Sequence, residues 1–449
     1  MKFINNKKLV NYSIKLKINY DTQKIIDRKI NLINKNSFKI KTTINRINNL
    51  LVLKNFLKKH KQNLINLIAN EANKTFNESK SEFDYAIEFV DYSLNLLSKY
   101  KFIKNINNNR KIFLKSIGLV FAMTPYNDPL AGIIRKIAPS LCAGSPIILK
   151  PSPYCTNLSQ YLSSNLPKDL KKIIQITIIK KNKFTTRIVQ NKKIKLVTFT
   201  GSTKTGLILN NIKISHTQKK ILELGGINYA IIFDDNNLES IIDEVLIRKI
   251  KAAGQACSSI NKLYVHKQIK CKFEKIIQSK VSRIFCGNVF TKHQPHFGPV
   301  ISKKHCIFLK TLEHKSLKTD YLLAKSKNKN DTKNLFPLTL IETGFNDKVF
   351  DKFETFGPLL GVSYFENENT VLKKVSENEY SLVCYIFTKS PKIINLAKNL
   401  NFGSLGINTT KIQSPGAPTG GNNLSGLGRE GGEWGLSEFL TTVNCVINK

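Results

Sequence analysis

Residues 194–206 read IKLVTFTGSTKTG, in which an apolar and β-branched run ends directly before Gly201, Ser202 and Gly206. Such a run predicts a buried strand, and the small residues after it predict a tight turn into a helix. Backbone amides at a helix start of this kind suit a phosphate group. The segment therefore predicts either a phosphate-binding turn or, with equal weight, an ordinary strand-to-helix connection.

The same pattern recurs on both sides of this segment. Short apolar runs occur in SIGLVFAMTP and GSPIILKPS, where Pro follows the run, and in YAIIFDD and NKLYVH, and residues 133–141 have a helical pattern. This alternation predicts βαβ units and an α/β fold with a buried parallel sheet. Residues 45–100 carry apolar side chains at three-to-four spacing without proline, which predicts a pair of packed helices.

Length and charge limit the class of protein. The 449 residues favour two or three domains, and 41% hydrophobic residues allow a sizeable core. Lys and Arg number 71 against 31 Asp and Glu, and the net charge of +40 would attract nucleic acid or anionic lipid. The excess is spread along the whole chain with abundant Asn and Ile, which we interpret as a codon bias. We expect nucleic acid to bind only non-specifically, if at all.

The cysteines give no sign of a disulfide framework or a metal site. The eight cysteines include no CxxC pair and no metal-ligand spacing with His. No apolar stretch approaches the roughly 18 residues that span a membrane, and residues 1–17 lack the apolar run of a signal peptide. We therefore expect a cytoplasmic protein with no membrane partner and no metal.

A literal GxGxxG pattern occurs at Gly426, Gly428 and Gly431. The dinucleotide-binding fingerprint must follow a strand and open a βαβ unit. Here the pattern follows GGNNLS, and too few residues come after it to complete such a unit. We interpret it as a loop.

Two reactive side chains stand out from their surroundings. Glu223 in ILELGG lies between two leucines, where desolvation would raise the pKa of its carboxyl toward that of a usable general base. Cys257 in AGQACSS lies among small residues, and its thiol can act as a nucleophile if the thiolate is favoured. Each taken singly has a plainer interpretation, a salt-bridged Glu and an inert buried Cys.

Their order along the chain changes this assessment. The chain presents TPYNDPL, ILKPS, FTGSTKTG, LELGG, GQAC, ETFGPL and SGLGRE in turn, and this series resembles the aldehyde dehydrogenase superfamily from about Asn63 onward. The resemblance implies a Rossmann-like cofactor domain, an α/β catalytic domain and a small β oligomerisation element. It places the cofactor domain at 1–225, with 100–116 contributing to the oligomerisation element, and the catalytic domain at 226–415. Residues 416–449 then return to the first domain and end in an oligomerisation strand.

The resemblance also implies a role for each matching catalytic residue. Cys257 matches the nucleophile that forms a hemithioacetal with the aldehyde, from which hydride passes to the nicotinamide and leaves a thioester. Glu223 matches the general base that activates water for hydrolysis. Asn127 matches the amide that completes the oxyanion hole with the backbone N–H of Cys257.

The cofactor implied is NAD or NADP. Lys150 matches the lysine at the adenosine ribose, Ser202 with Gly201 and Gly206 the pyrophosphate turn, and Glu354 with Phe356 the clamp on the nicotinamide ribose. Many NAD-preferring members carry a Glu three residues after the lysine, where this chain has Pro153. The missing carboxylate removes repulsion against a 2'-phosphate, so NADP is permitted.

Within the superfamily, IIRKIAPSLCAG and GINTTKIQSPGAPTGG resemble succinate-semialdehyde dehydrogenases. Arg135 matches the arginine that holds the distal carboxylate, Lys251 replaces a second arginine, and Ser414 matches a hydroxyl contact. In TPYNDPL, Asp128 replaces a usual apolar or aromatic residue beside the site. Succinate semialdehyde is the expected substrate.

Two alternatives stay open. The enzyme could act on another short anionic aldehyde, phosphorylated or hydroxylated. A degenerate member that binds polyanions through its basic surface is the rival from a different class. Members of the superfamily assemble as homodimers or homotetramers, which we expect here.

Overall fold

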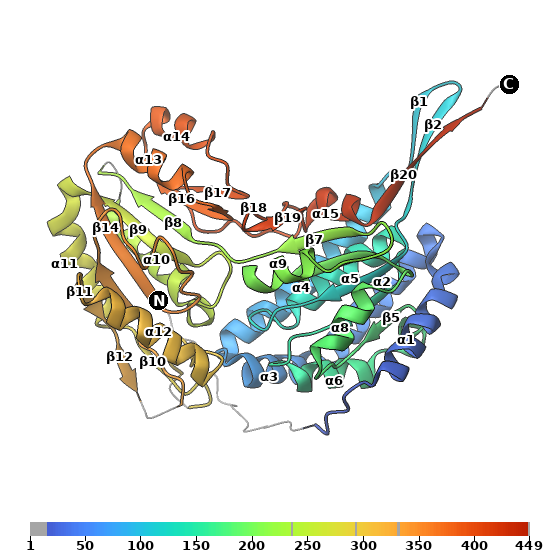
Figure 1. Cartoon of the computed structure of the whole chain (residues 1–449). Helices are drawn as coiled ribbons and strands as arrows, with labels where there is room; N and C mark the ends of the chain where they lie inside the picture. The colour runs from blue at the N-terminus through green and yellow to red at the C-terminus, as the bar shows by residue number, and fades with distance from the viewer. Residues whose placement is uncertain (1–15, 235–236, 292–293, 330–332, 448–449) are drawn as a thin grey trace.

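The computed structural model describes residues 16–234, 237–291, 294–329 and 333–447. Residues 1–15, which contain most of the segment assessed for a signal peptide, lie outside the described part. Within the described residues, no helix is long and apolar enough to cross a membrane. The chain forms two lobes, each built around its own sheet, and a projecting arm (Figure 1).

The first lobe contains a six-stranded sheet, which is parallel except for one edge strand. Its central strand is buried along its whole length, as expected for a sheet covered on both faces. The strand order is β19 (Gly426–Leu427), β7 (Lys219–Glu223), β6 (Ile194–Thr200), β3 (Leu119–Met123), β4 (Ile147–Lys150) and β5 (Ile174–Ile176). The α/β prediction is confirmed, and β6 is the buried strand predicted within residues 194–206.

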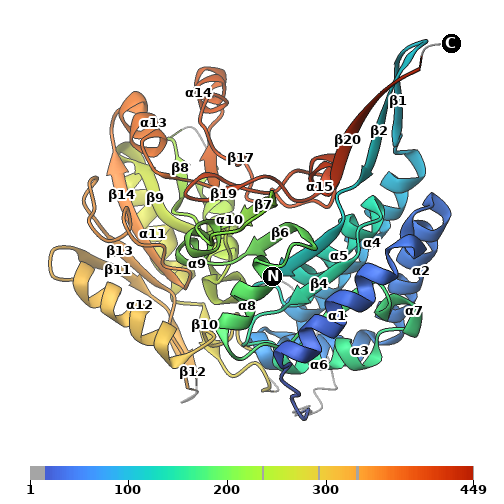
Figure 2. The ribbon, with the colours of Figure 1, turned by 45° about the vertical axis from the view of Figure 1, so that its right-hand side comes forward.

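Helices pack around this sheet in both views (Figures 1 and 2). They are α1 (Gln23–Lys35), η1 (Ser37–Ile40), α2 (Thr43–Lys59), α3 (Lys61–Ala72), α4 (Phe76–Lys99), α5 (Ala131–Ala143), α6 (Thr156–Asn165), α7 (Lys168–Lys171), α8 (Asn182–Val189) and α9 (Thr203–Asn210). The prediction of a helix pair over 45–100 was wrong, because three helices fill that range. The chain breaks at His60 and again at Asn73, whose φ is 54°, before the Thr75–Glu78 capping box starts α4.

The second lobe contains a seven-stranded sheet with one antiparallel edge strand. Its order is β11 (Tyr321–Lys325), β13 (Thr339–Glu342), β14 (Leu359–Phe365), β9 (Ile260–His266), β8 (Asn228–Ile232), β16 (Val383–Phe387) and β17 (Ser404–Ile407). Around it lie α10 (Leu238–Ile250), η2 (Lys251–Gly254), η3 (Lys267–Ile269), α11 (Lys270–Val281), α12 (Lys303–Ser316), α13 (Glu368–Ser376) and α14 (Pro391–Ala397). Two short pairs, β10 (Phe285–Gly287) with β12 (Lys327–Lys329) and β15 (Tyr380–Ser381) with β18 (Asn422–Asn423), complete the strands.

The arm is a three-stranded antiparallel sheet that projects from the first lobe (Figures 1 and 2). It joins β1 (Ile103–Asn107) and β2 (Arg110–Ser116) to β20 (Leu440–Val446), which follows α15 (Gly432–Glu438). The segments around 100–116 and near the C-terminus thus meet as the resemblance implied. The domain limits at 225 and 415 stay a prediction.

The GxGxxG segment is not a dinucleotide fingerprint. Gly426 pairs with Glu223 at the antiparallel edge of the first sheet, and Gly431, with a φ of 77°, precedes α15. After Gly431, the structure as described to residue 447 contains α15 and β20 and no βαβ unit. The segment instead brings Glu430 beneath the candidate active site described next.

Strand ends determine where that site lies. Asn127, Lys150, Ser202 and Glu223 all stand at or just after the carboxyl ends of strands in the first sheet, where open α/β sheets bind ligands. Cys257 and Glu354 instead precede β9 and β14 of the second sheet. The sequence-predicted residues therefore come from facing edges of the two lobes.

Candidate active site

The loop before Cys257 has an unusual backbone. Ala252, Ala253 and Gly254 have φ values of 51°, 56° and 73°, so three consecutive residues are left-handed. A Cβ on Gly254 would lie 2.4 Å from the carbonyl oxygen of Gly357, so only glycine allows this approach. Gln255 stabilises the turn, because its side-chain Nε2 donates a hydrogen bond to the carbonyl oxygen of Ala252 at 3.0 Å. Tertiary contacts therefore fix the loop.

Cys257 is half-buried, and Asn228 donates a hydrogen bond of 2.6 Å to its carbonyl oxygen. Burial, followed by the nearby carboxylate of Glu223, raises the pKa of the Cys257 thiol to about 12. The thiol is therefore protonated at neutral pH, and a base must accept its proton as the sulfur attacks a carbonyl carbon.

Tyr126, the residue before Asn127, contacts the loop that carries Cys257. The hydroxyl of Tyr126 donates to Gln255 Oε1 at 3.3 Å, and the ring of Tyr126 lies 6.0 Å from that of Phe356. Asn127 is 7% exposed, and none of the hydrogen bonds among the described residues uses its side chain. Its amide is available to a ligand oxygen, as an oxyanion-hole donor must be.

Glu223 ends β7 and is 1% exposed, and its Oε1 atom has no hydrogen-bond partner within the described structure. Burial, followed by the charge of Glu430, raises the pKa of Glu223 to about 7, while Arg135 and Lys136 act in the opposite direction. A carboxyl of this kind takes up and releases a proton near neutral pH, which suits a general base.

Beneath Glu223, three buried charges share contacts. Arg135 Nη2 lies 2.8 Å from Glu430 Oε2, and Lys136 binds the other oxygen of the same carboxylate and donates to the Thr198 hydroxyl at 2.6 Å. Burial opposes ionisation of Glu430, but Lys136 and then Arg135 lower the pKa of its carboxyl. These cations therefore keep Glu430 negative beside Glu223.

The residues proposed for a nicotinamide nucleotide are compatible with one. Lys150 ends β4, and although burial lowers the pKa of its ammonium, no hydrogen bond or ion pair in the described part of the chain uses it. Such a cation fits ribose hydroxyls. Gly226 donates to Glu354 Oε1 at 3.1 Å, and a Cβ on Gly225 would lie 2.1 Å from Glu354 Oε2.

The turn after β6 has both a capping and a packing role. Ser202 caps α9 by accepting a hydrogen bond from the Thr205 amide at 3.4 Å. A Cβ on Gly206 would lie 2.3 Å from the Leu224 side chain, and one on Gly201 2.4 Å from the Phe199 ring. A larger residue at either position would have to displace these side chains, and phosphate binding there stays a prediction.

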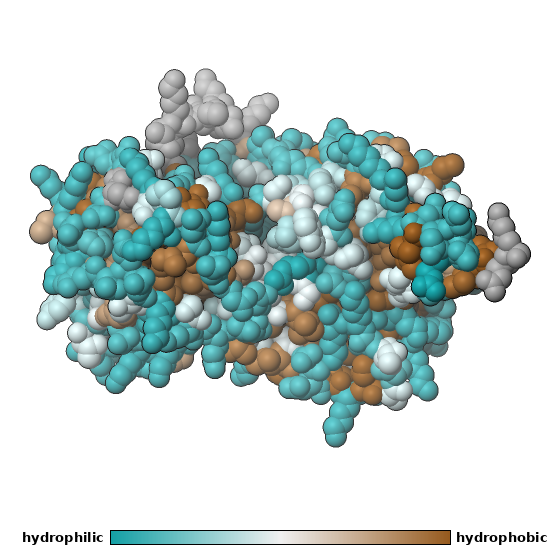
Figure 3. Space-filling view, turned by 90° about the horizontal axis from the view of Figure 1, so that it is seen from above, coloured by the Kyte–Doolittle hydropathy of each residue, from teal (hydrophilic) through white to brown (hydrophobic). Residues whose placement is uncertain are grey.

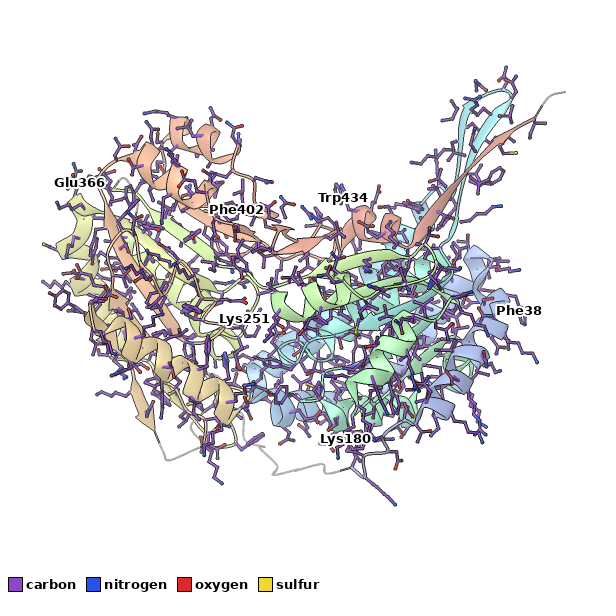
Figure 4. The ribbon with its side chains drawn as sticks, viewed as in Figure 1. Phe38, Lys180, Lys251, Glu366, Phe402 and Trp434 are labelled. Carbon is purple, nitrogen blue, oxygen red and sulfur yellow. The ribbon has the colours of Figure 1, made fainter. Side chains whose placement is uncertain are left out.

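The substrate candidates are placed differently from one another. Arg135 is 7% exposed and already pairs with Glu430, but no hydrogen bond in the described part uses its Nε or Nη1. Lys251 is exposed and lies between the lobes (Figure 4). Ser414 is exposed, accepts from the Gly416 amide at 3.4 Å, and has no described contact with Arg135 or Lys251.

Sequence reasoning missed Glu430 and Lys136. SGLGRE was noted only as a motif, and Lys136 directly follows Arg135, so the sequence contained both. Their partnership could not be found from spacing, because 294 residues separate them. The available signal was the pair Arg135 and Lys136 inside the mostly apolar helical pattern of residues 133–141.

Comparisons with known proteins identify the family of the chain. The sequence model of the aldehyde dehydrogenase family matches residues 17–445. A succinate semialdehyde dehydrogenase from Acinetobacter baylyi is 30% identical over 394 residues, covering 84% of this chain and 80% of the relative. A D-glyceraldehyde dehydrogenase (NADP(+)) from Picrophilus torridus is 29% identical, covering 87% and 82%. The structure of a betaine aldehyde dehydrogenase from Staphylococcus aureus in complex with NAD+ aligns with a TM-score of 0.88 at 26% identity, covering 96% and 88%.

Replacing Glu430 tests the buried charge cluster. Glu430→Gln leaves Arg135 and Lys136 without their shared carboxylate, so we expect the free energy of unfolding to fall by about 3–5 kcal/mol. Urea denaturation at pH 7 measures it. The control is Glu438→Gln, since Glu438 pairs with the more exposed Lys219, and its loss should stay below about 1 kcal/mol. Equal losses in the two variants would contradict this account.

Proposed function

Because this chain belongs to the aldehyde dehydrogenase family, whose members are NAD(P)-dependent aldehyde oxidoreductases, we propose that it oxidises a short aldehyde with a distal carboxylate to the acid. The observation that carries the proposal is that the charges of Glu223 and Arg135 both act on the Cys257 thiol, with Glu223 at the end of β7 and Cys257 just before β9. Succinate semialdehyde is the simplest such substrate.

The chemistry assigned to the chain's own residues is as follows. The Cys257 sulfur attacks the aldehyde carbon as its proton leaves for Glu223, and the Asn127 amide donates to the oxygen that becomes negative. Bound NAD(P) supplies the acceptor for the hydride of the aldehyde carbon. Glu223 releases the thiol proton to solvent and, as a carboxylate again, takes a proton from the water that attacks the thioester. The acid leaves as Glu223 returns this proton to the sulfur.

The substrate proposal rests on cations at the site. Arg135, Lys251 and the hydroxyl of Ser414 are the groups proposed for the distal carboxylate. Similarity to a succinate semialdehyde dehydrogenase supports this choice. A relative named for D-glyceraldehyde keeps a hydroxylated short aldehyde as the second candidate.

Polyanion binding has less support. Hydrophilic residues spread over the visible face of the molecule instead of gathering over one lobe (Figure 3). A charge of +40 that is spread along the chain gives weak, salt-sensitive attraction to polyanions.

Three further proposals concern organisation. The arm is the proposed oligomerisation element of a homodimer or homotetramer, since exposed Ile103, Ile106, Val443 and Val446 lie on its strands. The division into cofactor and catalytic domains near residue 225 follows the change from the first sheet to the second. All eight thiols are free, which favours the reducing cytoplasm.

The proposed adenosine region favours NADP. A cavity of about 100 Å³ lies beside the end of β4, and its lining contains no carboxylate and one cation, Lys180. Pro153 lines it at the place where the resemblance led us to look for a carboxylate. Lys180 lies on the first lobe (Figure 4) and could pair with a 2'-phosphate.

Activity with succinate semialdehyde is the first test. Purified protein should reduce NADP or NAD with this aldehyde, and Cys257→Ala should remove turnover while leaving the thermal unfolding midpoint within a few degrees. Cys271→Ala, which changes an exposed thiol, is the control and should stay active. Full turnover by Cys257→Ala would refute the proposed nucleophile.

The pH dependence tests Glu223. The ionised form is the base, so kcat should rise with pH through an apparent pKa near 7 and level off above it. Glu223→Gln should lose steady-state turnover and also slow the first burst of NAD(P)H, because both the transfer of the thiol proton and the hydrolysis of the thioester need the carboxylate. Glu354→Gln, measured at saturating cofactor, should keep the rise of kcat with pH. If the rise disappears in this variant, it belongs to Glu354 instead of Glu223.

Replacing Lys180 tests cofactor selection. Lys180→Glu should raise KM for NADP by about tenfold or more, since it exchanges attraction for repulsion at the 2'-phosphate, and should change KM for NAD little. Initial rates with each cofactor measure this. Lys181→Glu, an exposed neighbour outside the cavity lining, should leave both constants near those of the unchanged protein. An equal effect of the two variants would contradict the role.

A further inference from the structure

Asp128 is an ionised carboxylate next to the proposed oxyanion amide. Its side chain is 34% exposed, and Lys74 donates to Oδ1 at 2.9 Å. No hydrogen bond in the described part of the chain reaches Oδ2. Burial would raise the pKa of Asp128, but the charges of Lys74 and then Lys251 lower it to about 2. One oxygen of a permanent anion is therefore open to a ligand.

The cation that holds Asp128 is already shared. Lys74 is buried, and its ammonium also donates to Glu82 Oε2 at 2.8 Å. The other oxygen of Glu82 accepts from the amides of Leu130 and Ala131 at 2.8 and 3.1 Å, at the start of α5. This cluster of one cation and two carboxylates leaves Asp128 incompletely neutralised.

The same helix brings Lys251 to this side of the site. Glu78, one turn before Glu82 on α4, accepts the amide hydrogen of Ala252 at 2.7 Å and so fixes the residue that follows Lys251. The Lys251 ammonium is a charged neighbour of Asp128 but makes no ion pair with any described residue. Their separation therefore exceeds the 4.0 Å of an ion pair and leaves room for ligand groups.

Resting on the proposed aldehyde oxidation, we propose that Asp128 and Lys251 form a subsite for a zwitterion, so that the preferred substrate is the semialdehyde of an α-amino acid. Its carboxylate binds Lys251 and the free donors of Arg135, and its ammonium binds Asp128. An aldehyde whose only charged group is a carboxylate is repelled by Asp128, and one whose only charged group is an ammonium is repelled by Lys251.

Three aldehydes that differ by one charged group test this subsite. Aspartate 4-semialdehyde carries an ammonium and a carboxylate, succinate semialdehyde carries only the carboxylate, and 3-aminopropanal carries only the ammonium. The unchanged protein should have its highest kcat/KM with aspartate 4-semialdehyde. A value for succinate semialdehyde equal to or above it would overturn the proposal.

Asp128→Asn should lower the ratio of kcat/KM for the zwitterion over the anion at least tenfold. The variant keeps the Lys74–Glu82 pair, so the fold should persist. Asp84→Asn is the matched control, because Asp84 lies on α4, pairs with Lys61 and Lys80 and is 39% exposed. It should leave the ratio unchanged. A ratio unchanged in Asp128→Asn sinks the subsite while aldehyde oxidation stands.

Lys251→Gln separates the two charges. It should weaken both carboxylate-bearing substrates by similar factors and improve 3-aminopropanal. A selective loss of the zwitterion alone would contradict the assignment of the carboxylate to Lys251.

Calorimetric binding of the corresponding products keeps the test independent of turnover. L-aspartate should bind more tightly than succinate or β-alanine, and Asp128→Asn should abolish that advantage. If no aldehyde is oxidised but this binding pattern holds, the proposed oxidation fails and the subsite stands. If L-aspartate has no advantage, the subsite is refuted whatever the enzyme oxidises.

Discussion

The carboxylate of Glu430 determines the charge balance of the whole site. It is shared by Arg135, Lys136 and the Thr200 hydroxyl, which donates at 3.1 Å, and its own backbone pairs with Thr419. Without it, α5 would place two uncompensated cations under Glu223. With it, Glu223 stays buried at a pKa of about 7. The C-terminal segment is therefore part of the candidate active site, together with residues from both sheets.

The first turns of α4 organise the other side of the site. Lys74 and Thr75 start the helix, Glu78 holds the loop before the nucleophile, and Glu82 holds the first amides of α5. One helix end thus sets the distance between the proposed oxyanion amide and the sulfur. Burial makes these contacts costly to leave incomplete, so the polar network specifies one arrangement of the two lobes.

Much of the fold could be predicted from short patterns. The apolar runs became β3, β4, β6, β8 and β9, because the apolar pattern of a strand is local in sequence. The break at Asn73 was not predictable in this way, since an asparagine replaces glycine in the left-handed position. The α/β fold and the family were both confirmed.

In the candidate site too, local features could be predicted from the sequence and long-range contacts could not. Cys257 and Glu223 stood out by their neighbours in sequence, but the contacts that tune them come from distant residues. Asp128 was noticed only as a departure, because Lys74, its partner, lies 54 residues earlier.

The left-handed run at Ala252 and Ala253 has a consequence for the loop that carries the reactive sulfur. Each alanine in this conformation costs about 1–2 kcal/mol. Gln255 stabilises the turn from within, but the carboxylate of Glu78 reaches it from the other lobe. The conformation that presents the thiol therefore depends on contact between the two lobes.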